Sequence, residues 1–218
     1  MKVADGLYAF VWTSITENNC NSYLIDGPAK ILIDPGHFRL FDYLESRLKA
    51  VRIEVPDIDL VLVTHAHPDH LEAVRRFQNH RTLFALSAED WRLIEPTGDQ
   101  LKGYNAGARP PDFFLGPGDL NINGIRLKII PAPGHSPGSV AIYWPDRKAL
   151  FTGDVIFRDG LGRTDLPGGN GSVLKRSIKE LSSIDCELLL PGHMEIIKGS
   201  AEIKENFRRV EELWFRYI

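Results

Sequence analysis

The sequence predicts an α/β or α+β fold in which helices cover the faces of sheets. Short apolar runs of strand length alternate along the chain with segments whose apolar residues recur every three or four positions, as on one face of a helix. The 218 residues are 43% apolar and 25% charged, an ordinary composition for a soluble globular protein. This length fits one large domain over residues 1–218 better than two domains.

The first half of the chain contains a predicted hairpin followed by mixed elements. Residues 23–25 and 31–33 are apolar and flank a Gly-Pro turn, which supplies the backbone angles of a tight reversal. Helical spacing of apolar residues predicts a helix over 38–50, and a continuous apolar run predicts a buried strand over 59–64. The other elements expected in this half are a helix over 71–77, a strand over 83–86, and a short helix over 87–94 with Ser87 as N-cap.

The second half begins with an unusual segment and then returns to strands and helices. Residues 96–119 are rich in Gly, Pro and aromatic residues, which predicts a long loop or broken helix, and such loops are often functional. The elements expected after it are strands over 125–130, 140–144, 149–152 and 187–190, and helices over 172–181 and 201–217. The two predicted hairpins each end in an aspartate close to a glycine, Asp34 and Asp154, which suggests a duplicated strand–helix unit.

A hexapeptide that reads HAHPDH directly follows the predicted buried strand and contains four potential metal ligands. Pro68 disfavours helical backbone angles at His67. His65 and His67 therefore lie two apart in extended chain, share a face, and can reach one ion together. Asp69 and His70 fall where the chain turns and can serve a second ion. Groups packed this closely are costly to bury without a metal ion or a charged partner, so the segment predicts a metal site.

Three further ligand candidates each follow a short apolar run and a glycine: His135, Asp154 and His193. Glycine lets the backbone bend at these points, and ligands from the ends of several strands can converge at one edge of a sheet. On composition alone, each of the three is as compatible with packing as with metal binding. The imidazole and carboxylate donors, without thiolate, permit zinc, iron or manganese.

This string of motifs resembles the metallo-β-lactamase superfamily. HAHPDH matches the HxHxDH signature, and the later Gly-His, Gly-Asp and Gly-His elements match in order, so the resemblance extends from the first hairpin to His193. It implies an αββα four-layer sandwich. It also implies a ligand set for two divalent metal ions, with His65, His67 and His135 on one, Asp69, His70 and His193 on the other, and Asp154 bridging.

The same resemblance suggests a mechanism. Two divalent ions roughly 3.5–4 Å apart can share a water molecule and lower its pKa towards about 7. Asp154 would hold the ions at that spacing and Asp69 would orient the water, which makes these two the predicted catalytic residues. A thiolate whose acid has a pKa of about 8.5 departs with little protonation. Because the sequence shows no obvious further general acid, a thioester or lactone is favoured over an amide as the substrate.

A finer resemblance points to one branch of the superfamily. Residues 152–157, TGDVIF, and 162–169, GRTDLPGG, resemble the glyoxalase II branch, which also contains persulfide dioxygenases. This implies a hydroxyacylglutathione-hydrolase-like thioester hydrolase. Alternatives are a lactonase or other hydrolase of this fold, and a mononuclear iron persulfide dioxygenase with His65, His135 and Asp154 as ligands. Only 218 − 193 = 25 residues of this sequence follow the last ligand, enough for one helix, so we expect no counterpart of the helical domain that helps glyoxalase II hold glutathione.

A purely structural metal site is the non-enzymatic alternative. Structural zinc sites usually close with four ligands, often cysteines, and seven nitrogen and oxygen ligands fit catalysis better. Substrate contacts are expected from Tyr104, Arg109, Phe113, Arg163 and His37. For Arg163 we prefer an ion pair with Asp165 that fixes its loop.

Charge and composition exclude some partners. The formal net charge is -3 and basic residues form no dense block, which argues against nucleic acid. The first ten residues do not read as a signal peptide, and the apolar runs are too short to span a membrane. The two cysteines, Cys20 and Cys186, are expected to be packing residues in a reducing cytoplasm. A small-molecule substrate is expected, and the sequence leaves a monomer or a homodimer open.

Overall fold

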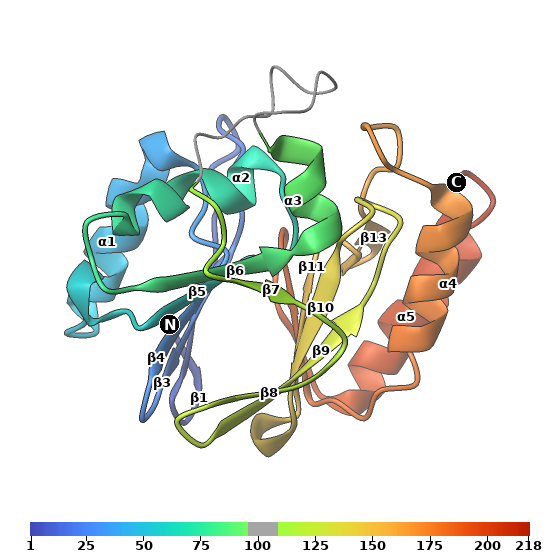
Figure 1. Ribbon diagram of the computed structural model, residues 1–218. Helices are drawn as coiled ribbons and strands as arrows, with labels where there is room; N and C mark the ends of the chain where they lie inside the picture. Colours follow the sequence, from blue (N-terminus) through green and yellow to red (C-terminus); the bar gives the residue numbers. More distant parts are fainter. Residues whose placement is uncertain (96–108) are drawn as a thin grey trace.

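A computed structural model describes residues 1–95 and 109–218 as two stacked sheets with helices on their outer faces (Figure 1). Helices α1, α2 and α3 lie beside the seven-stranded sheet, and α4 and α5 lie beside the six-stranded sheet. The predicted α/β class and the four-layer sandwich are therefore confirmed. No helix among the described residues is long and apolar enough to cross a membrane.

The seven-stranded sheet contains the N-terminal half of the chain, with the strands in sequence order. Its strands are β1 (Lys2–Ala4), β2 (Leu7–Phe10), β3 (Ser22–Asp26), β4 (Lys30–Ile33), β5 (Leu60–Leu62), β6 (Leu83–Ser87) and β7 (Phe113–Leu115). Strands β1 to β4 are antiparallel neighbours, and β4 to β7 pair in parallel. The parallel pairs need crossover connections, and these carry α1, α2 and α3.

The six-stranded sheet has the order β15-β14-β11-β10-β9-β8. Its strands are β8 (Gly118–Ile122), β9 (Ile125–Pro131), β10 (Val140–Trp144), β11 (Ala149–Gly153), β14 (Leu188–Pro191) and β15 (Ile197–Lys198). Only the β11–β14 pair is parallel. A separate small hairpin joins β12 (Ile156–Phe157) to β13 (Gly160–Leu161).

The helices cover the outer faces of the two sheets. They are α1 (Phe41–Ala50), α2 (Pro68–Leu71), α3 (Ala88–Ile94), α4 (Gly171–Leu181) and α5 (Ser200–Trp214), with short 3-10 turns at Phe38–Leu40, Val55–Asp57, Glu72–Phe77 and Pro145–Arg147. One apolar cluster fills the space between the sheets, where Tyr23 packs edge-on against Phe151 with ring centroids 5.3 Å apart. Two more clusters join the helices to the outer faces, and both cysteines are buried and unpaired within the fold.

Most predicted elements are present, with two corrections. The helix predicted over 71–77 is a 3-10 turn that follows the one-turn helix α2, in which Pro68 occupies the first turn. The loop predicted over 96–119 is wrong for its last part, because β7 pairs with β6 and β8 begins at Gly118 and pairs with β9. The N-cap prediction is confirmed, since Ser87 Oγ accepts a hydrogen bond from Asp90 N at 3.2 Å.

Candidate metal centre

The ends of several strands bring the predicted ligands to one edge of the sandwich. Strands β4 and β5 are parallel in one sheet, and β11 and β14 are parallel in the other. Asp34 follows β4, HAHPDH follows β5, Asp154 follows β11 and His193 comes two residues after β14. His135 lies in the connection from β9 to β10. An antiparallel pair followed by a parallel strand therefore occurs in both sheets, the arrangement that a duplicated unit would produce.

Three histidines form what we call the first ligand group: His65, His67 and His135. Their donor atoms lie within 4.8 Å of one another, and all three side chains are buried. His135 Nε2 lies 2.7 Å from His67 Nδ1 and 3.2 Å from His65 Nε2. Three imidazole nitrogens that face one another in a buried space are the arrangement that a metal ion requires of its ligands.

Asp69, His70 and His193 form the second ligand group, and their donor atoms also lie within 4.8 Å of one another. Asp69 and His70 are buried, whereas the His193 side chain keeps 21% of its surface exposed. His193 Nε2 lies 3.3 Å from Asp69 Oδ2. A site with one partly exposed ligand leaves room for a substrate to approach, unlike a closed structural site.

Asp154 lies between the two groups and contacts both. Its Oδ2 is 3.5 Å from His135 Nε2 in the first group and 3.4 Å from His193 Nε2 in the second. Its Oδ1 is 3.2 Å from His70 Nε2. Glycine at position 192 allows this approach, because a Cβ there would lie 2.3 Å from Asp154 Oδ1. The structure thus brings together all seven residues that the sequence predicts as ligands.

Two buried atoms in this cluster test whether it fits a metal ion. His70 Nε2 and Asp154 Oδ1 are shielded from solvent and lie 3.2 Å apart, but neither forms a well-aligned hydrogen bond with a described residue. Buried polar atoms without a hydrogen bond are costly, and an imidazole nitrogen and a carboxylate oxygen are both ligands of divalent metals. The cluster therefore fits divalent metal ions.

Asp34 orients one of the ligands. Its Oδ2 accepts hydrogen bonds from His70 Nδ1 at 2.9 Å and from Thr64 Oγ1 at 2.8 Å, and its Oδ1 accepts one from Thr64 N. This places a proton on His70 Nδ1, so that loss of the second proton on metal binding would leave the lone pair on Nε2. His135 is fixed in the same way, because its Nδ1 donates to the Arg163 carbonyl at 2.7 Å.

Asp90 is a site residue that the sequence analysis missed. It is fully buried in the first turn of α3. Its Oδ2 accepts hydrogen bonds from Ala66 N at 2.7 Å and Ser136 Oγ at 2.8 Å, and its Oδ1 accepts one from Gly138 N at 2.6 Å. One carboxylate thus ties the segment of His65 and His67 to the loop of His135.

Asn18, in the loop between β2 and β3, was also missed. Its Nδ2 donates a hydrogen bond of 2.7 Å to Asp69 Oδ2. The asparagine lies 51 positions away from Asp69 in the chain, and no local spacing signals the pairing.

Known proteins resemble this chain over the region that contains the ligand motifs. The model of the metallo-β-lactamase superfamily matches residues 15–193. The chain belongs to this superfamily. A probable metallo-hydrolase of Methanocaldococcus jannaschii is 36% identical over 189 residues, 81% of this chain and 88% of the relative. The hydroxyacylglutathione hydrolase GloC of Haemophilus influenzae is 32% identical over 201 residues, 87% of this chain and 92% of that one.

A solved structure extends the comparison. TTHA1623 in a di-iron-bound form is 29% identical, with a TM-score of 0.75 over 94% of this chain and 100% of the other. Together with the GloC relative, the matches confirm the resemblance to the glyoxalase II-like branch and identify the chain as a metallo-hydrolase of the superfamily. Membership of this hydrolase family implies a small-molecule substrate.

The two ligand groups of this superfamily member differ in the protonation that their surroundings favour. Burial lowers the pKa of His65 well below its usual value and lowers the pKa of His67 to about 4. Burial alone would also lower the pKa of His193, but the neighbouring Asp154 carboxylate raises it to about 9. The pKa of His70 is raised well above its usual value in the same way, against the effect of burial. In the absence of metal, protons therefore collect in the second group.

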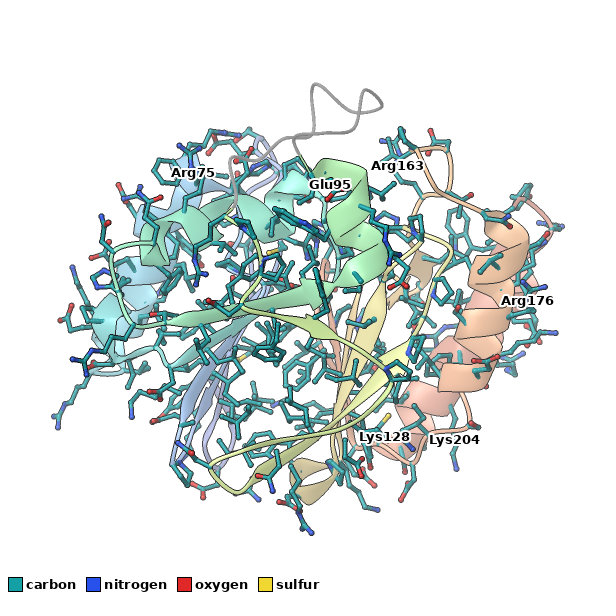
Figure 2. The ribbon with its side chains drawn as sticks, viewed as in Figure 1. Arg75, Glu95, Lys128, Arg163, Arg176 and Lys204 are labelled. Atoms are coloured by element: carbon teal, nitrogen blue, oxygen red, sulfur yellow. The ribbon has the colours of Figure 1, made fainter. Side chains whose placement is uncertain are left out.

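A cavity of about 690 Å³ opens beside the ligand cluster. Outside the cluster, its lining includes Asn18, His37, Phe157, Leu161, Arg163, Leu166 and Met194. His37 thus lies at the site, where its Nδ1 contacts Glu72 Oε2 at 2.8 Å. Arg163 makes the predicted ion pair with Asp165, through Nε–Oδ1 and Nη2–Oδ2 contacts of 2.7 and 2.6 Å. Figure 2 shows Arg163 at the same end of the molecule as Glu95.

The other predicted substrate contacts lie away from the cavity or outside the described residues. Tyr104 lies outside the described residues. Arg109 donates to the Thr82 carbonyl at 3.0 Å and pairs with Asp112 at 2.7 Å. Phe113, in β7, packs against the cluster between the sheets. Neither Arg109 nor Phe113 occurs among the described residues that line the cavity.

Proposed function

We propose that this metallo-hydrolase cleaves thioesters with a pair of divalent metal ions held by the two ligand groups and Asp154. The observation that carries the proposal is the position of the Asp154 carboxylate, 3.2–3.5 Å from histidines of both groups. The hydroxyacylglutathione hydrolase GloC, 32% identical, supports a thioester as the substrate. The physiological setting that we propose is a reducing cytoplasm, in which two buried cysteines remain thiols.

In this proposal a bound metal pair supplies an activated water and a polarised carbonyl group. Asp154 keeps the two groups together, and Asp34 and the Arg163 carbonyl hold the rings of His70 and His135 in the required tautomers. Asp69, which lines the cavity, accepts a hydrogen bond from the attacking water and orients it towards the carbonyl carbon.

The leaving group explains why no further acid is needed. A C–O bond forms from the water to the acyl carbon, and the C–S bond breaks with its electron pair on sulfur. A thiol has a pKa of about 8.5, so the thiolate departs without prior protonation. The products are a carboxylate and a thiol, with the released proton passing to solvent.

Metal analysis of the purified protein, combined with a substrate panel, tests the proposal. We expect about two metal ions per chain, hydrolysis of thioesters, and no dioxygen uptake. The panel should include lactones and a persulfide. One iron per chain with persulfide-dependent dioxygen uptake would instead establish the mononuclear dioxygenase, and turnover of lactones alone would refute the thioester assignment.

A further inference from the structure

The walls of the cavity beside the ligand cluster differ in polarity. Asn18 and His37 lie on the side of the seven-stranded sheet, in loops that follow β2 and β4. The segments that follow Asp154 and His193 contribute Gly162, Arg163 and four apolar side chains to the lining, and we call these four the apolar wall: Phe157, Leu161, Leu166 and Met194. Three of its members come from the segment 156–166 that follows Asp154, and the fourth follows His193.

The apolar wall begins at the ligand cluster itself. The Phe157 ring stands edge-on to the His193 ring, with centroids 5.6 Å apart and an interplanar angle of 86°. Phe157 and Leu161 belong to the β12–β13 hairpin, where Ile156 pairs with Leu161. A group attached to a carbonyl over the metal site would therefore lie beside Phe157, the first residue of this wall.

Met194 provides an independent observation. Its side chain is 60% exposed, although it is large and apolar. Its backbone adopts φ +67°, a left-handed conformation that is unfavourable for a residue with a side chain. The buried Asn21 holds the peptide there, because Asn21 Nδ2 donates to the Met194 carbonyl at 2.8 Å. Strained residues of this kind cluster at functional sites. Because the Met194 side chain is exposed, it does not contribute to the hydrophobic core.

We propose that the apolar wall binds a hydrocarbon acyl group, so that the substrate class is thioesters of apolar carboxylic acids. This inference rests on the proposed thioester hydrolysis. Arg163, from the same segment, also lines the cavity, but its guanidinium pairs with Asp165 and is therefore engaged before a charged acyl group could bind. The unbranched thioether of Met194 adapts to different shapes, so the structure favours a graded preference for longer chains over selection of one acid.

A chain-length series on the metal-loaded protein tests the inference. The substrates are acetyl, butyryl and hexanoyl thioesters of one thiol, N-acetylcysteamine. We expect kcat/KM to rise about fourfold per methylene group, the factor that corresponds to burial of ~0.8 kcal/mol per CH₂. Met194→Gln and Leu166→Gln should each lower the hexanoyl-to-acetyl ratio of kcat/KM several-fold, and the double variant should lower it at least tenfold.

Leu213→Gln is the matched control, because Leu213 is 50% exposed on α5 and does not line this cavity. Its hexanoyl-to-acetyl ratio should equal that of the wild type. If all three thioesters are hydrolysed at equal kcat/KM, the inference is overturned while thioester hydrolysis stands.

A binding measurement keeps the inference separate from catalysis. Butanoate and hexanoate resemble the acid product and can be titrated into metal-loaded protein by calorimetry. We expect hexanoate to bind more tightly, and Met194→Gln to remove the difference. Failure of every thioester to react, together with this binding preference, would refute the proposed function and retain the apolar wall. Equal binding of the two acids would refute the wall.

Discussion

Asp154 contacts both ligand groups, yet the two groups differ in charge. In the first group, burial lowers the pKa values of His65 and His67, so these imidazoles are neutral at physiological pH. The second group contains the Asp69 carboxylate and a histidine, His193, whose pKa is about 9. A cation entering the first group meets free lone pairs, whereas a cation entering the second must displace protons. We therefore expect the first position to fill before the second.

The largest expected effect comes from removing the group that joins the two positions. Asp154→Asn replaces the negative charge between them with a neutral amide. We expect kcat/KM for thioester hydrolysis to fall by about 10³-fold or more, because metal-derived stabilisation is worth several kcal/mol. Metal content per chain should fall as well, measured by elemental analysis.

Asp119→Asn is the control for this substitution, since Asp119 is an exposed aspartate on β8 outside the ligand cluster. It should retain wild-type rate and metal content. If Asp154→Asn kept both metal ions and full activity, Asp154 would not be the link between the groups.

Asp90 ties together the segments that supply the ligands of the first group, through two backbone N–H groups and the Ser136 hydroxyl, and should show the next largest effect. In Asp90→Asn an amide NH₂ would replace one of the two fully buried carboxylate oxygens. It would then face either Ala66 N–H and Ser136 Oγ, or Gly138 N–H. Leaving such groups unsatisfied costs about 1–3 kcal/mol. We expect that loss in the free energy of unfolding of the metal-free protein, measured with urea.

Glu89→Gln, at the exposed neighbouring position in the same helical turn, should leave the unfolding free energy unchanged. A wild-type urea midpoint for Asp90→Asn would show that the three hydrogen bonds do not hold the ligand loops together.

The hexapeptide HAHPDH and Asp90 show which parts of the site the sequence could predict and which it could not. The hexapeptide places four ligand types next to one another after a strand, so its chemistry is visible without a fold. His135, Asp154 and His193 are single residues from separate loops, and only the resemblance to a family connected them. Asp90 follows Ser87 as an ordinary acidic residue of a capped helix, and its pairing with loops 24 and 46 positions away depends on tertiary packing.

The fold was predictable for a similar reason. Hairpins and buried strands with clear apolar runs were located nearly to the residue, as at β10, which spans the predicted 140–144. Strand β7 was missed because it is a short edge strand that follows a Gly- and Pro-rich segment. Its hydrogen bonds to β6 define it, and its own sequence pattern does not.

The charge difference between the two groups predicts a pH dependence. Below pH 9 the metal-free protein carries a second proton on the His193 imidazole, and the raised pKa of His70 adds another, whereas metal binding requires both rings to be neutral. Affinity at the second position should therefore rise with pH by about tenfold per pH unit for each proton displaced, with the His193 contribution levelling off above about pH 9. At the first position, where the pKa of His67 is about 4, affinity should be almost flat between pH 6 and 9.

Titration of the metal-free protein with zinc at pH 6, 7, 8 and 9 measures both positions. The protonation difference predicts one tight and one weak site at pH 6, with the two affinities converging at high pH. Two sites with the same pH slope would contradict the assignment of the extra proton to the second group.

The smallest expected effect lies at the border of the first group. Asp165→Asn breaks the exposed ion pair with Arg163. Exposed ion pairs contribute little to stability, and His135 is oriented by the backbone carbonyl of Arg163, not by its guanidinium. We therefore expect the urea midpoint to stay at the wild-type value and metal affinity to change by less than about twofold. A tenfold loss of affinity would mean that the ion pair positions the loop, and through it the carbonyl that fixes the His135 tautomer.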